Sequence, residues 1–244
     1  MKLKNKVAIV TGASTGIGRS ITIEFARQGA IVGLVSRFVE GLNQTFKAVN
    51  KVGGKGEVFV LDLRENKAIQ DLAKKIKNKW KKVDVLVNVA GVYHGKDKAY
   101  FGIGFADYSV DQILETFDVG ITAPTLLSHQ LLPLMGVGSK IINISGTFES
   151  GAKGWLPYYV SKKAIEDLTV GLSQELRDKQ IQVNCISPSD TLTESYKKFF
   201  PEYAKEEICL KPEDVANLAV FLASEEADHI TGQIIVLKQK SAKG

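Results

Sequence analysis

The strongest indication of the fold is the run Val7-Ala8-Ile9-Val10-Thr11-Gly12-Ala13-Ser14-Thr15-Gly16-Ile17-Gly18. Its first four residues form a continuous apolar segment, which is typical of a parallel strand buried on both faces. A glycine turn follows at once, and a helical pattern that includes Ile21 and Phe25 then continues to Gln28 and Gly29. A strand, a glycine turn and a helix in this order predict a phosphate-binding site at the helix N-terminus.

The glycines of this turn have different physical tasks. Gly12 permits the tight turn, Gly16 lets the backbone approach a pyrophosphate, and Gly18 lets the helix pack on the sheet. We therefore expect a dinucleotide to contact Gly12, Ser14, Thr15, Gly16, Ile17 and Gly18.

The end of the second strand indicates which dinucleotide binds. The apolar segment at residues 31–35 leads into Ser36 and Arg37. An acidic residue at this place accepts hydrogen bonds from ribose hydroxyls, whereas an arginine pairs with a 2′-phosphate. Ser36 and Arg37 therefore favour NADP(H) over NAD(H), although an arginine at a strand end also occurs as an ordinary surface residue.

Strand and helix patterns alternate along the remaining chain. Apolar strand-like segments are expected at residues 58–61, 83–87, 140–145, 181–186 and 233–237. Helical patterns are expected at residues 40–52, 67–80, 110–117, 123–134, 157–177 and 211–222. This alternation predicts an α/β protein with a single-domain Rossmann fold, in which a doubly wound parallel sheet of about seven strands has helices on both faces. Neither a linker nor a repeat interrupts residues 1–244, and we expect a frayed tail at 238–244.

Tyr158 and Lys162 stand four residues apart at the start of the longest helical pattern, where Pro157 suits the first turn. Residues i and i+4 share a helix face. A phenol has a pKa of about 10 in water, so it becomes a useful acid or base at neutral pH only when nearby positive charge stabilises the phenolate. Lys162 is positioned to supply that charge. On spacing alone, a pair of solvated surface side chains is the alternative.

Composition argues against several other functions. The net charge of +5 comes in part from lysines between residues 74 and 82, which a solvated helix face explains; no aromatic-interleaved RNA motif accompanies them, so we expect no nucleic-acid partner. No run of about 18 apolar residues is present, which predicts no membrane partner, and no N-terminal signal pattern is present, which predicts a cytoplasmic protein. The two cysteines cannot form a disulfide framework, and the three histidines are solitary, so we expect no metal site.

Two irregular segments, at about 92–108 and 190–210, interrupt the alternation. Both contain several aromatic residues, and the first is also rich in glycine, as expected for loops over a binding site. The first segment is equally consistent with a packing or oligomer contact, and the second is expected to form a mobile helical flap. We expect the substrate pocket to be built from these two segments.

Six motifs then occur in an order and spacing shared with one protein family: Thr11-Gly12-Ala13-Ser14-Thr15-Gly16-Ile17-Gly18, Asp62-Leu63, Asn88-Val89-Ala90-Gly91, Asn143-Ile144-Ser145, Tyr158-Tyr159-Val160-Ser161-Lys162 and Ile230-Thr231-Gly232-Gln233. Through them the chain resembles the short-chain dehydrogenase/reductase family over residues 6–237. Residues 211–216 and the Thr231-Gly232-Gln233 ending are most similar to 3-oxoacyl-[acyl-carrier-protein] reductase-like members.

The resemblance implies hydride transfer between NADP(H) and a small-molecule carbonyl or secondary alcohol. Tyr158 would exchange the proton of the substrate oxygen. Lys162 would lower the pKa of Tyr158 and bond the nicotinamide ribose, and Ser145 would steady the developing alkoxide. Beyond the glycine turn, the implied cofactor contacts are Ser36, Arg37, Asp62, Leu63, Asn88, Ala90, Gly91, Tyr158, Lys162, Pro188, Thr191 and Thr193. A homo-oligomer, either a tetramer or a dimer, is implied as well.

The tyrosine could be assigned in two ways, because Tyr159 and Lys163 have the same spacing as Tyr158 and Lys162. Ser161, directly before Lys162, matches the family motif. We therefore expect Tyr158 and Lys162 to be the functional pair.

The predicted serine departs from the family pattern. The usual Asn-Ser-Ser strand end is replaced by Asn143-Ile144-Ser145-Gly146, so the usual serine position falls on Ser145 by its distance to Tyr158 and on Gly146 by the strand motif. Adjacent residues of a regular strand point to opposite faces, so the two alignments place the serine position on opposite sides of the sheet. We expect the Ser145 hydroxyl to stabilise the developing alkoxide, with Thr147 as the substitute hydroxyl.

Asp118 is a second departure, because it stands where the family has a proton-relay asparagine. An ionised aspartate accepts hydrogen bonds but cannot donate them. Near Lys162 it could also form an ion pair, which would change the effect of the lysine on Tyr158.

Two functional hypotheses follow. The first is an NADP(H)-dependent oxidoreductase acting on a carbonyl or secondary alcohol, with Tyr158, Lys162, Ser145 and Asp118 as catalytic residues. The second, motivated by Asp118 and Gly146, is a catalytically weak NADP(H)-binding protein that works as a sensor or scaffold.

Overall fold

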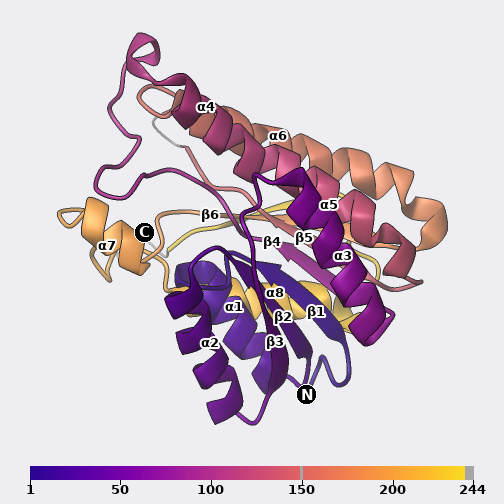
Figure 1. Cartoon of the computed structure of the whole chain (residues 1–244). Helices are drawn as coiled ribbons and strands as arrows, with labels where there is room; N and C mark the ends of the chain where they lie inside the picture. The colour runs from indigo at the N-terminus through magenta and orange to yellow at the C-terminus, as the bar shows by residue number, and fades with distance from the viewer. Residues whose placement is uncertain (149–150, 240–244) are drawn as a thin grey trace.

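The computed structural model describes residues 1–148 and 151–239, and within them seven strands form one parallel sheet in the order β3-β2-β1-β4-β5-β6-β7 (Figure 1). The strands are β1 (Val7–Thr11), β2 (Ile31–Ser36), β3 (Lys55–Val60), β4 (Val85–Asn88), β5 (Lys140–Ile144), β6 (Gln182–Pro188) and β7 (Ile234–Leu237). The strand order reverses between β1 and β4, which makes the sheet doubly wound and opens a crevice at the carboxyl ends of these strands. The predicted Rossmann fold is confirmed.

Helices cover both faces of the sheet. They are α1 (Gly16–Arg27), α2 (Val39–Lys51), α3 (Asn66–Trp80), α4 (Val110–Phe117), α5 (Ala123–Leu131), α6 (Leu156–Glu175), α7 (Glu194–Phe199) and α8 (Pro212–Ala223). The first core cluster joins the sheet to α1, α2 and α8, and the second joins its other face to α3, α5 and α6 (Figure 1). No helix of the described residues is long and apolar enough to span a membrane.

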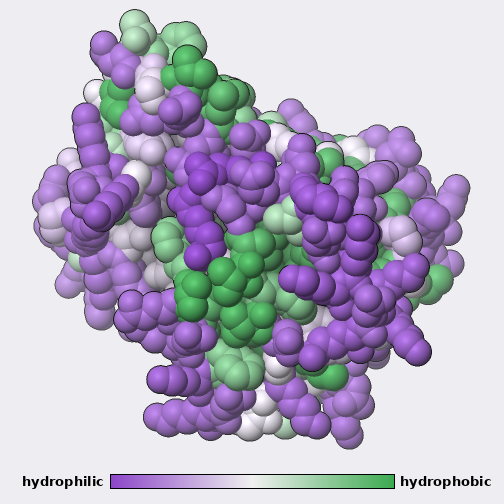
Figure 2. Space-filling model, viewed as in Figure 1, coloured by the Kyte–Doolittle hydropathy of each residue, from purple (hydrophilic) through white to green (hydrophobic). Residues whose placement is uncertain are grey.

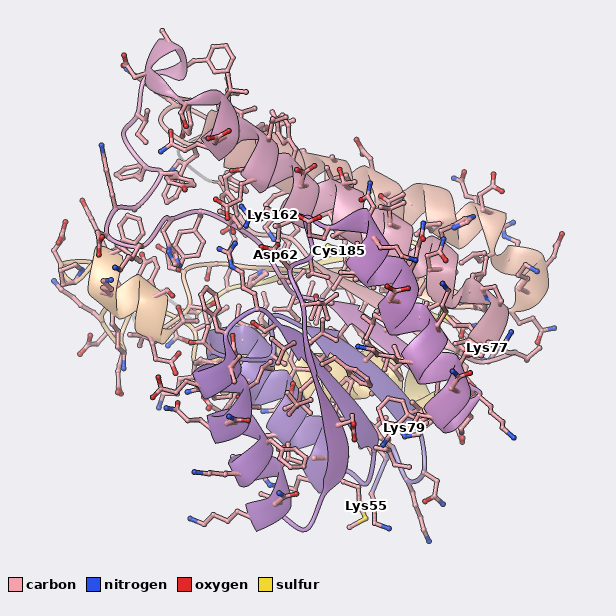
Figure 3. All side chains as sticks on the ribbon, in the orientation of Figure 1. Lys55, Asp62, Lys77, Lys79, Lys162 and Cys185 are labelled. Carbon is pink, nitrogen blue, oxygen red and sulfur yellow. The ribbon has the colours of Figure 1, made fainter. Side chains whose placement is uncertain are left out.

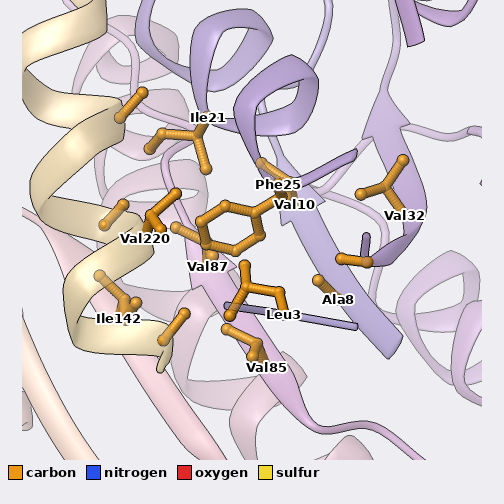
Figure 4. Packing of buried hydrophobic residues seen from close by; sticks show 14 of the residues in the cluster. Leu3, Ala8, Val10, Ile21, Phe25, Val32, Val85, Val87, Ile142 and Val220 are labelled. Atoms are coloured by element: carbon orange, nitrogen blue, oxygen red, sulfur yellow. The ribbon is translucent and has the colours of Figure 1, made fainter. Parts of the chain in front are cut away.

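The apolar run in β1 is explained by burial on both sides. Ala8 and Val10 belong to the first cluster, whereas Val7 and Ile9 belong to the second. Figure 4 shows the first cluster, in which the Phe25 ring of α1 lies at the centre of the side chains from the sheet and α8. Truncating a fully buried ring of this kind to alanine costs about 3–5 kcal/mol, so this packing holds α1 and the turn before it in place.

Gly18 sets how closely α1 follows the turn. A Cβ atom built on Gly18 would lie 2.2 Å from the carbonyl oxygen of Gly12. Any larger residue would therefore push the helix N-terminus away from the end of β1. The close approach predicted for this glycine is present.

Two elements differ from the sequence-based expectation. β3 begins at Lys55, three residues before the predicted start, because it pairs with the whole of β2 as an edge strand whose first residues are partly exposed and polar. Between α4 and α5 the chain forms a π-helical turn, Asp118–Thr122, in which the Ala123 N–H donates to the Asp118 carbonyl oxygen. Such wide turns occur often at functional sites and have no signature in hydrophobic periodicity.

The irregular segments carry little regular structure. Residues 92–108 contain the short 3₁₀ turn Phe105–Asp107, and residues 190–210 contain α7. Residues 240–244 of the predicted frayed tail lie outside the described residues, while the Gln239 side chain donates to the Glu206 carbonyl oxygen.

Candidate active site

A cleft of about 860 Å³ lies at the carboxyl ends of the strands, a volume typical of ligand pockets. Asp62 and Lys162 both line it and lie near the centre of the molecule in Figure 3. Lys55, Lys77 and Lys79 lie at the periphery in the same view, away from the cleft. The lysines of α3 therefore form a peripheral, solvated face, as expected.

Most of the sequence-predicted site residues meet in this cleft. The lining includes Gly12, Ser14, Thr15, Gly16, Ile17, Gly18, Ser36, Arg37, Asp62, Leu63, Ala90, Gly91, Ser145, Tyr158, Lys162, Pro188, Thr191 and Thr193. Asn88 and Asp118 are not among the lining residues. Asn88 lies buried below the cleft, where its amide donates to Asn143 Oδ1 at 2.8 Å.

The glycine-turn half of the cleft is formed by residues 12–18, 36–38 and 61–63, and its turn contacts a carboxylate of the protein that lines an adjacent cavity. Glu194 Oε2 accepts hydrogen bonds from the Gly16 N–H at 3.0 Å and the Thr15 hydroxyl at 2.9 Å. Arg19 Nη1 lies 2.7 Å from Glu194 Oε1. A carboxylate thus occupies the groups that were predicted to bind a pyrophosphate, and the glycine turn has the chemistry of an anion site.

The contacts of Glu194 favour its ionised form. Partial burial raises its pKa, but hydrogen bonds from its own N–H and from Thr15, together with the charge of Arg19, more than offset this and hold the pKa below its usual range. Neither Glu194 nor Arg19 was predicted from the sequence, because Glu194 stands 178 residues from Gly16.

Arg37 lies where a 2′-phosphate was expected, and it already has carboxylate partners. Its Nη1 lies 2.9 Å from Glu115 Oε1 and 3.6 Å from Asp62 Oδ2. Arg64 Nη2 lies 2.6 Å from the same Asp62 oxygen, and this hydrogen bond holds the pKa of Asp62 below its usual range. A phosphate would therefore have to compete with Glu115 for Arg37. Arg64 and Glu115 were not predicted from the sequence.

The Tyr158 half of the cleft is formed around Tyr158 by residues 92–94, 101, 144–148, 155 and 188–191, together with side chains from residues 193–208. Lys162 Nζ lies 5.5 Å from the centre of the Tyr158 ring and donates to the Ile144 carbonyl oxygen at 2.8 Å. A Cβ atom on Gly91 would lie 3.3 Å from this Nζ, so the glycine leaves the lysine room. Tyr159 does not line the cleft, which agrees with Tyr158 as the functional tyrosine.

Burial shifts the pKa values of both members of this pair. Burial raises the pKa of Tyr158, and the nearby Tyr93 phenol adds to the rise. Burial lowers the pKa of Lys162 to about 8. In the protein alone, burial therefore determines the direction of the Tyr158 pKa shift, because removing a phenolate from water disfavours the charged form.

The hydroxyl of Ser145 does not face the position in which it was expected to stabilise a substrate alkoxide. Its hydroxyl lies 2.7 Å from Glu166 Oε1 and 3.2 Å from the Lys162 carbonyl oxygen, both on α6. β5 ends at Ile144, so the rule that adjacent residues of a strand point to opposite faces no longer applies at Ser145. Ser145 is bonded to α6 and not to the Tyr158 phenol, whereas a Cβ atom on Gly146 would lie 3.9 Å from the Phe148 ring and 4.0 Å from the Pro188 carbonyl oxygen.

Asp118 likewise differs from expectation. It begins the π-helical turn, lies partly exposed and does not line the cleft. Among the ion pairs of the described residues, none joins Asp118 to Lys162. The structure therefore gives no support to the alternative ion-pair role, because the lysine instead donates to the carbonyl oxygen at the end of β5.

Comparison with known sequences gives a family for this fold and cleft. The sequence model of a family described as "Enoyl-(Acyl carrier protein) reductase" matches residues 12–239. The 3-oxoacyl-[acyl-carrier-protein] reductase of Thermotoga maritima is 30% identical over 248 residues, which cover 96% of this chain and 97% of that protein.

Solved structures agree with the sequence comparison. A short-chain dehydrogenase/reductase from Serratia marcescens superposes with a TM-score of 0.87 at 27% identity, covering 97% of this chain and 98% of that chain. A short-chain dehydrogenase from Shigella flexneri, complexed with NADP, superposes with a TM-score of 0.86 at 27% identity, covering 96% and 98%. The chain belongs to the short-chain dehydrogenase/reductase family of oxidoreductases.

Proposed function

We propose that the protein reduces a carbonyl group, or oxidises the corresponding secondary alcohol, with NADP(H) as the cofactor. The observation that carries this proposal is one cleft that holds an anion-binding glycine turn together with the Tyr158 phenol and the Lys162 ammonium. A phenol beside a buried cation is suited to exchange a proton with a carbonyl oxygen.

The residues present fit a dinucleotide. The glycine turn already holds a carboxylate, so its N–H and hydroxyl donors are aimed at an anion. Asn88 Oδ1 and Ser189 Oγ are buried without hydrogen-bond partners in the described part of the chain, and both belong to strand ends at or below the cleft. Unpartnered buried polar atoms are costly unless a ligand or water completes them. When bound, the cofactor supplies or accepts the hydride.

The proposed contacts divide along the cleft. The glycine turn would hold the pyrophosphate, Arg37 the 2′-phosphate, and Lys162 the ribose nearest the reacting carbon. The remaining contacts are those predicted from the sequence, of which Asp62, Leu63, Ala90, Gly91, Pro188, Thr191 and Thr193 line the cleft.

Tyr158 is the proposed general acid in the reduction. Because burial raises its pKa, the phenol is protonated at neutral pH and has a proton to give to the carbonyl oxygen. Lys162 carries a positive charge below a pH of about 8, and that charge stabilises the phenolate left behind. In the oxidation direction the same groups act in reverse.

A hydroxyl is still needed beside the substrate oxygen. Thr147 lines the cleft, and its backbone is fixed by an N–H bond to the Pro188 carbonyl oxygen. We assign to Thr147 the task that was first expected of Ser145, since the Ser145 hydroxyl faces Glu166. Ser145 then has a structural role, in which its hydroxyl bonds to Glu166 of α6.

The test is NADPH oxidation, followed by its absorbance, with a panel of ketones and aldehydes. Tyr158→Phe removes only the phenolic hydroxyl and is expected to lower kcat about 10²- to 10⁴-fold. Tyr159→Phe is the matched control and is expected to change little, because Tyr159 lies outside the cleft. Equal activity of both variants would contradict the assignment. NADPH binding without turnover of any carbonyl would favour the sensor or scaffold instead.

A homo-oligomer and a cytoplasmic location stay predictions. Val110 and Leu114 of α4 and Val160 of α6 are exposed, and α4 packs beside α6, so these helices offer an apolar surface for a second copy. Light scattering during size-exclusion chromatography would determine the oligomeric state.

A further inference from the structure

Aromatic rings surround the proposed acid. The centre of the Tyr158 ring lies 5.7 Å from that of Tyr93, 5.7 Å from that of Phe148 and 6.0 Å from that of Trp155. All three neighbours line the cleft. A substrate whose carbonyl reaches the Tyr158 hydroxyl therefore has rings on several sides.

A second group of rings continues this surface toward the mouth of the cleft. The centre of the Phe101 ring lies 4.6 Å from that of Trp155 and 5.8 Å from that of Phe200. The centres of the Trp155 and Phe200 rings lie 5.7 Å apart. These three rings also line the cleft. They come from both irregular segments and from the start of α6, so the surface forms only in the folded chain.

The outermost ring is accessible. Phe101 is 47% exposed, although it packs against Trp155 on one side. Figure 2 shows hydrophobic side chains gathered at the tip of the molecule, over the segment that precedes α4. A ring that is half covered by other rings and half open keeps a face or edge for a further aromatic group.

The two irregular segments are joined to each other across the cleft. The His94 ring lies 4.5 Å from the Phe199 ring, and the Lys198 ammonium donates to the Lys96 carbonyl oxygen at 2.9 Å. The walls of the aromatic surface therefore support one another. Preorganised rings lose less entropy on binding than mobile ones.

We propose that the substrate is a carbonyl compound with an aromatic ring close to the reacting carbon, and that this ring packs among Phe101, Trp155 and Phe200 while the carbonyl meets Tyr158. The assignment rests on the proposed function. A saturated chain would gain only from burial, whereas an aromatic ring also gains from edge and offset stacking. That gain is about 2- to 10-fold in affinity for each ring pairing.

Three methyl ketones of equal carbon count separate these contributions: 4-phenyl-2-butanone, 4-cyclohexyl-2-butanone and 2-decanone. The phenyl ketone is expected to have a kcat/KM about 10-fold above those of the other two, since the cyclohexyl ketone matches its shape without its π system. An equal or higher kcat/KM for the cyclohexyl or linear ketone would overturn the proposal.

Phe101→Leu tests the surface itself. It is expected to lower kcat/KM for the phenyl ketone about 2- to 10-fold and to affect the cyclohexyl ketone less. Phe105→Leu is the matched control, because Phe105 is 65% exposed and lies outside the cleft lining. An equal loss for both ketones in the Phe101 variant would mean that the ring provides only apolar area.

Calorimetric titration of the NADPH-loaded protein with each ketone gives a readout that does not depend on turnover. If no ketone is reduced but the phenyl ketone binds more tightly than the cyclohexyl ketone, the proposed function fails and the aromatic site stands. If ketones are reduced without a phenyl preference in rate or binding, the aromatic site fails and the proposed function stands.

Discussion

In the glycine-turn half of the cleft the arginines already hold carboxylates, whereas in the Tyr158 half Lys162 is buried beside a ring and belongs to no ion pair of the described residues. A cofactor anion that enters the first half must displace these carboxylates from the arginines. Its net binding free energy is therefore smaller than the number of its contacts suggests. In the second half the cost of burying the charge appears as a lowered pKa. Under the proposed function, the first arrangement tunes cofactor affinity and the second prepares the proton transfer.

Replacing Lys162 is the strongest test of this contrast. Lys162→Met removes the charge from the Tyr158 half and is expected to lower kcat at least about 100-fold, because the phenolate left by proton transfer loses its stabilisation. Lys163→Met is the control, since that lysine is exposed and pairs with Glu166. Equal losses in the two variants, measured by NADPH oxidation, would mean that the buried charge has no special role.

The pH dependence tests the same charge without changing the binding residues. The pKa of Lys162 is lowered to about 8, so the side chain is charged below that pH and neutral above it. We expect kcat/KM for carbonyl reduction to fall as the pH rises through about 8, approaching a tenfold loss per further pH unit. Lys162→Arg keeps its charge throughout, and its remaining activity should lack this decline. The same decline in both proteins would point to another group.

Arg37 tests the glycine-turn half. Arg37→Ala is expected to reduce the preference for NADPH over NADH about 10-fold, because a charge-assisted bond to the 2′-phosphate is lost, while Glu115 keeps only its longer ion pair with Arg64 at 3.6 Å. Dissociation constants of both cofactors, measured by fluorescence titration, give the ratio. Arg27→Ala is a control on the outer face, where Arg27 pairs with Glu24. An unchanged ratio would remove Arg37 from cofactor selection.

Glu194 acts in the opposite direction. Glu194→Gln removes the charge that sits on the glycine turn and is expected to tighten NADPH binding about 2- to 5-fold, the range of an exposed ion pair. Glu202→Gln, an exposed carboxylate of the same segment, is the control. Weaker NADPH binding by Glu194→Gln would show that this carboxylate supports the bound state and does not compete with it.

The glycine-turn half could be predicted from the sequence because its parts are local. Gly12, Gly16 and Gly18 follow an apolar strand directly, and Arg37 follows the next strand at once. Parallel strands then bring these ends together by a general rule of the fold. What could not be predicted is the partner of each group, since Glu194 reaches the turn from a distant segment.

The Tyr158 half shows where sequence reasoning stops. Helical spacing predicted Tyr158 and Lys162 on one face, and both line the cleft. Ser145 could not be oriented, because β5 ends one residue earlier and the alternation of strand faces ends with it. Phe101, Phe148 and Trp155 were missed as a group, because rings in segments without periodicity are brought together only by tertiary packing.

Glu115 provides the smallest and most selective test of partner exchange. Glu115→Gln keeps the size of the side chain but removes the charge that competes for Arg37, so NADPH binding is expected to tighten about 2- to 3-fold while NADH binding stays the same. Glu57→Gln, which affects an ion pair with Lys79 away from the cleft, is the control. If the Glu115 variant bound both cofactors more tightly by the same factor, the increase in affinity would come from the overall electrostatic potential of the cleft. A gain confined to NADPH requires a contact with the 2′-phosphate, because that group is the difference between the two ligands.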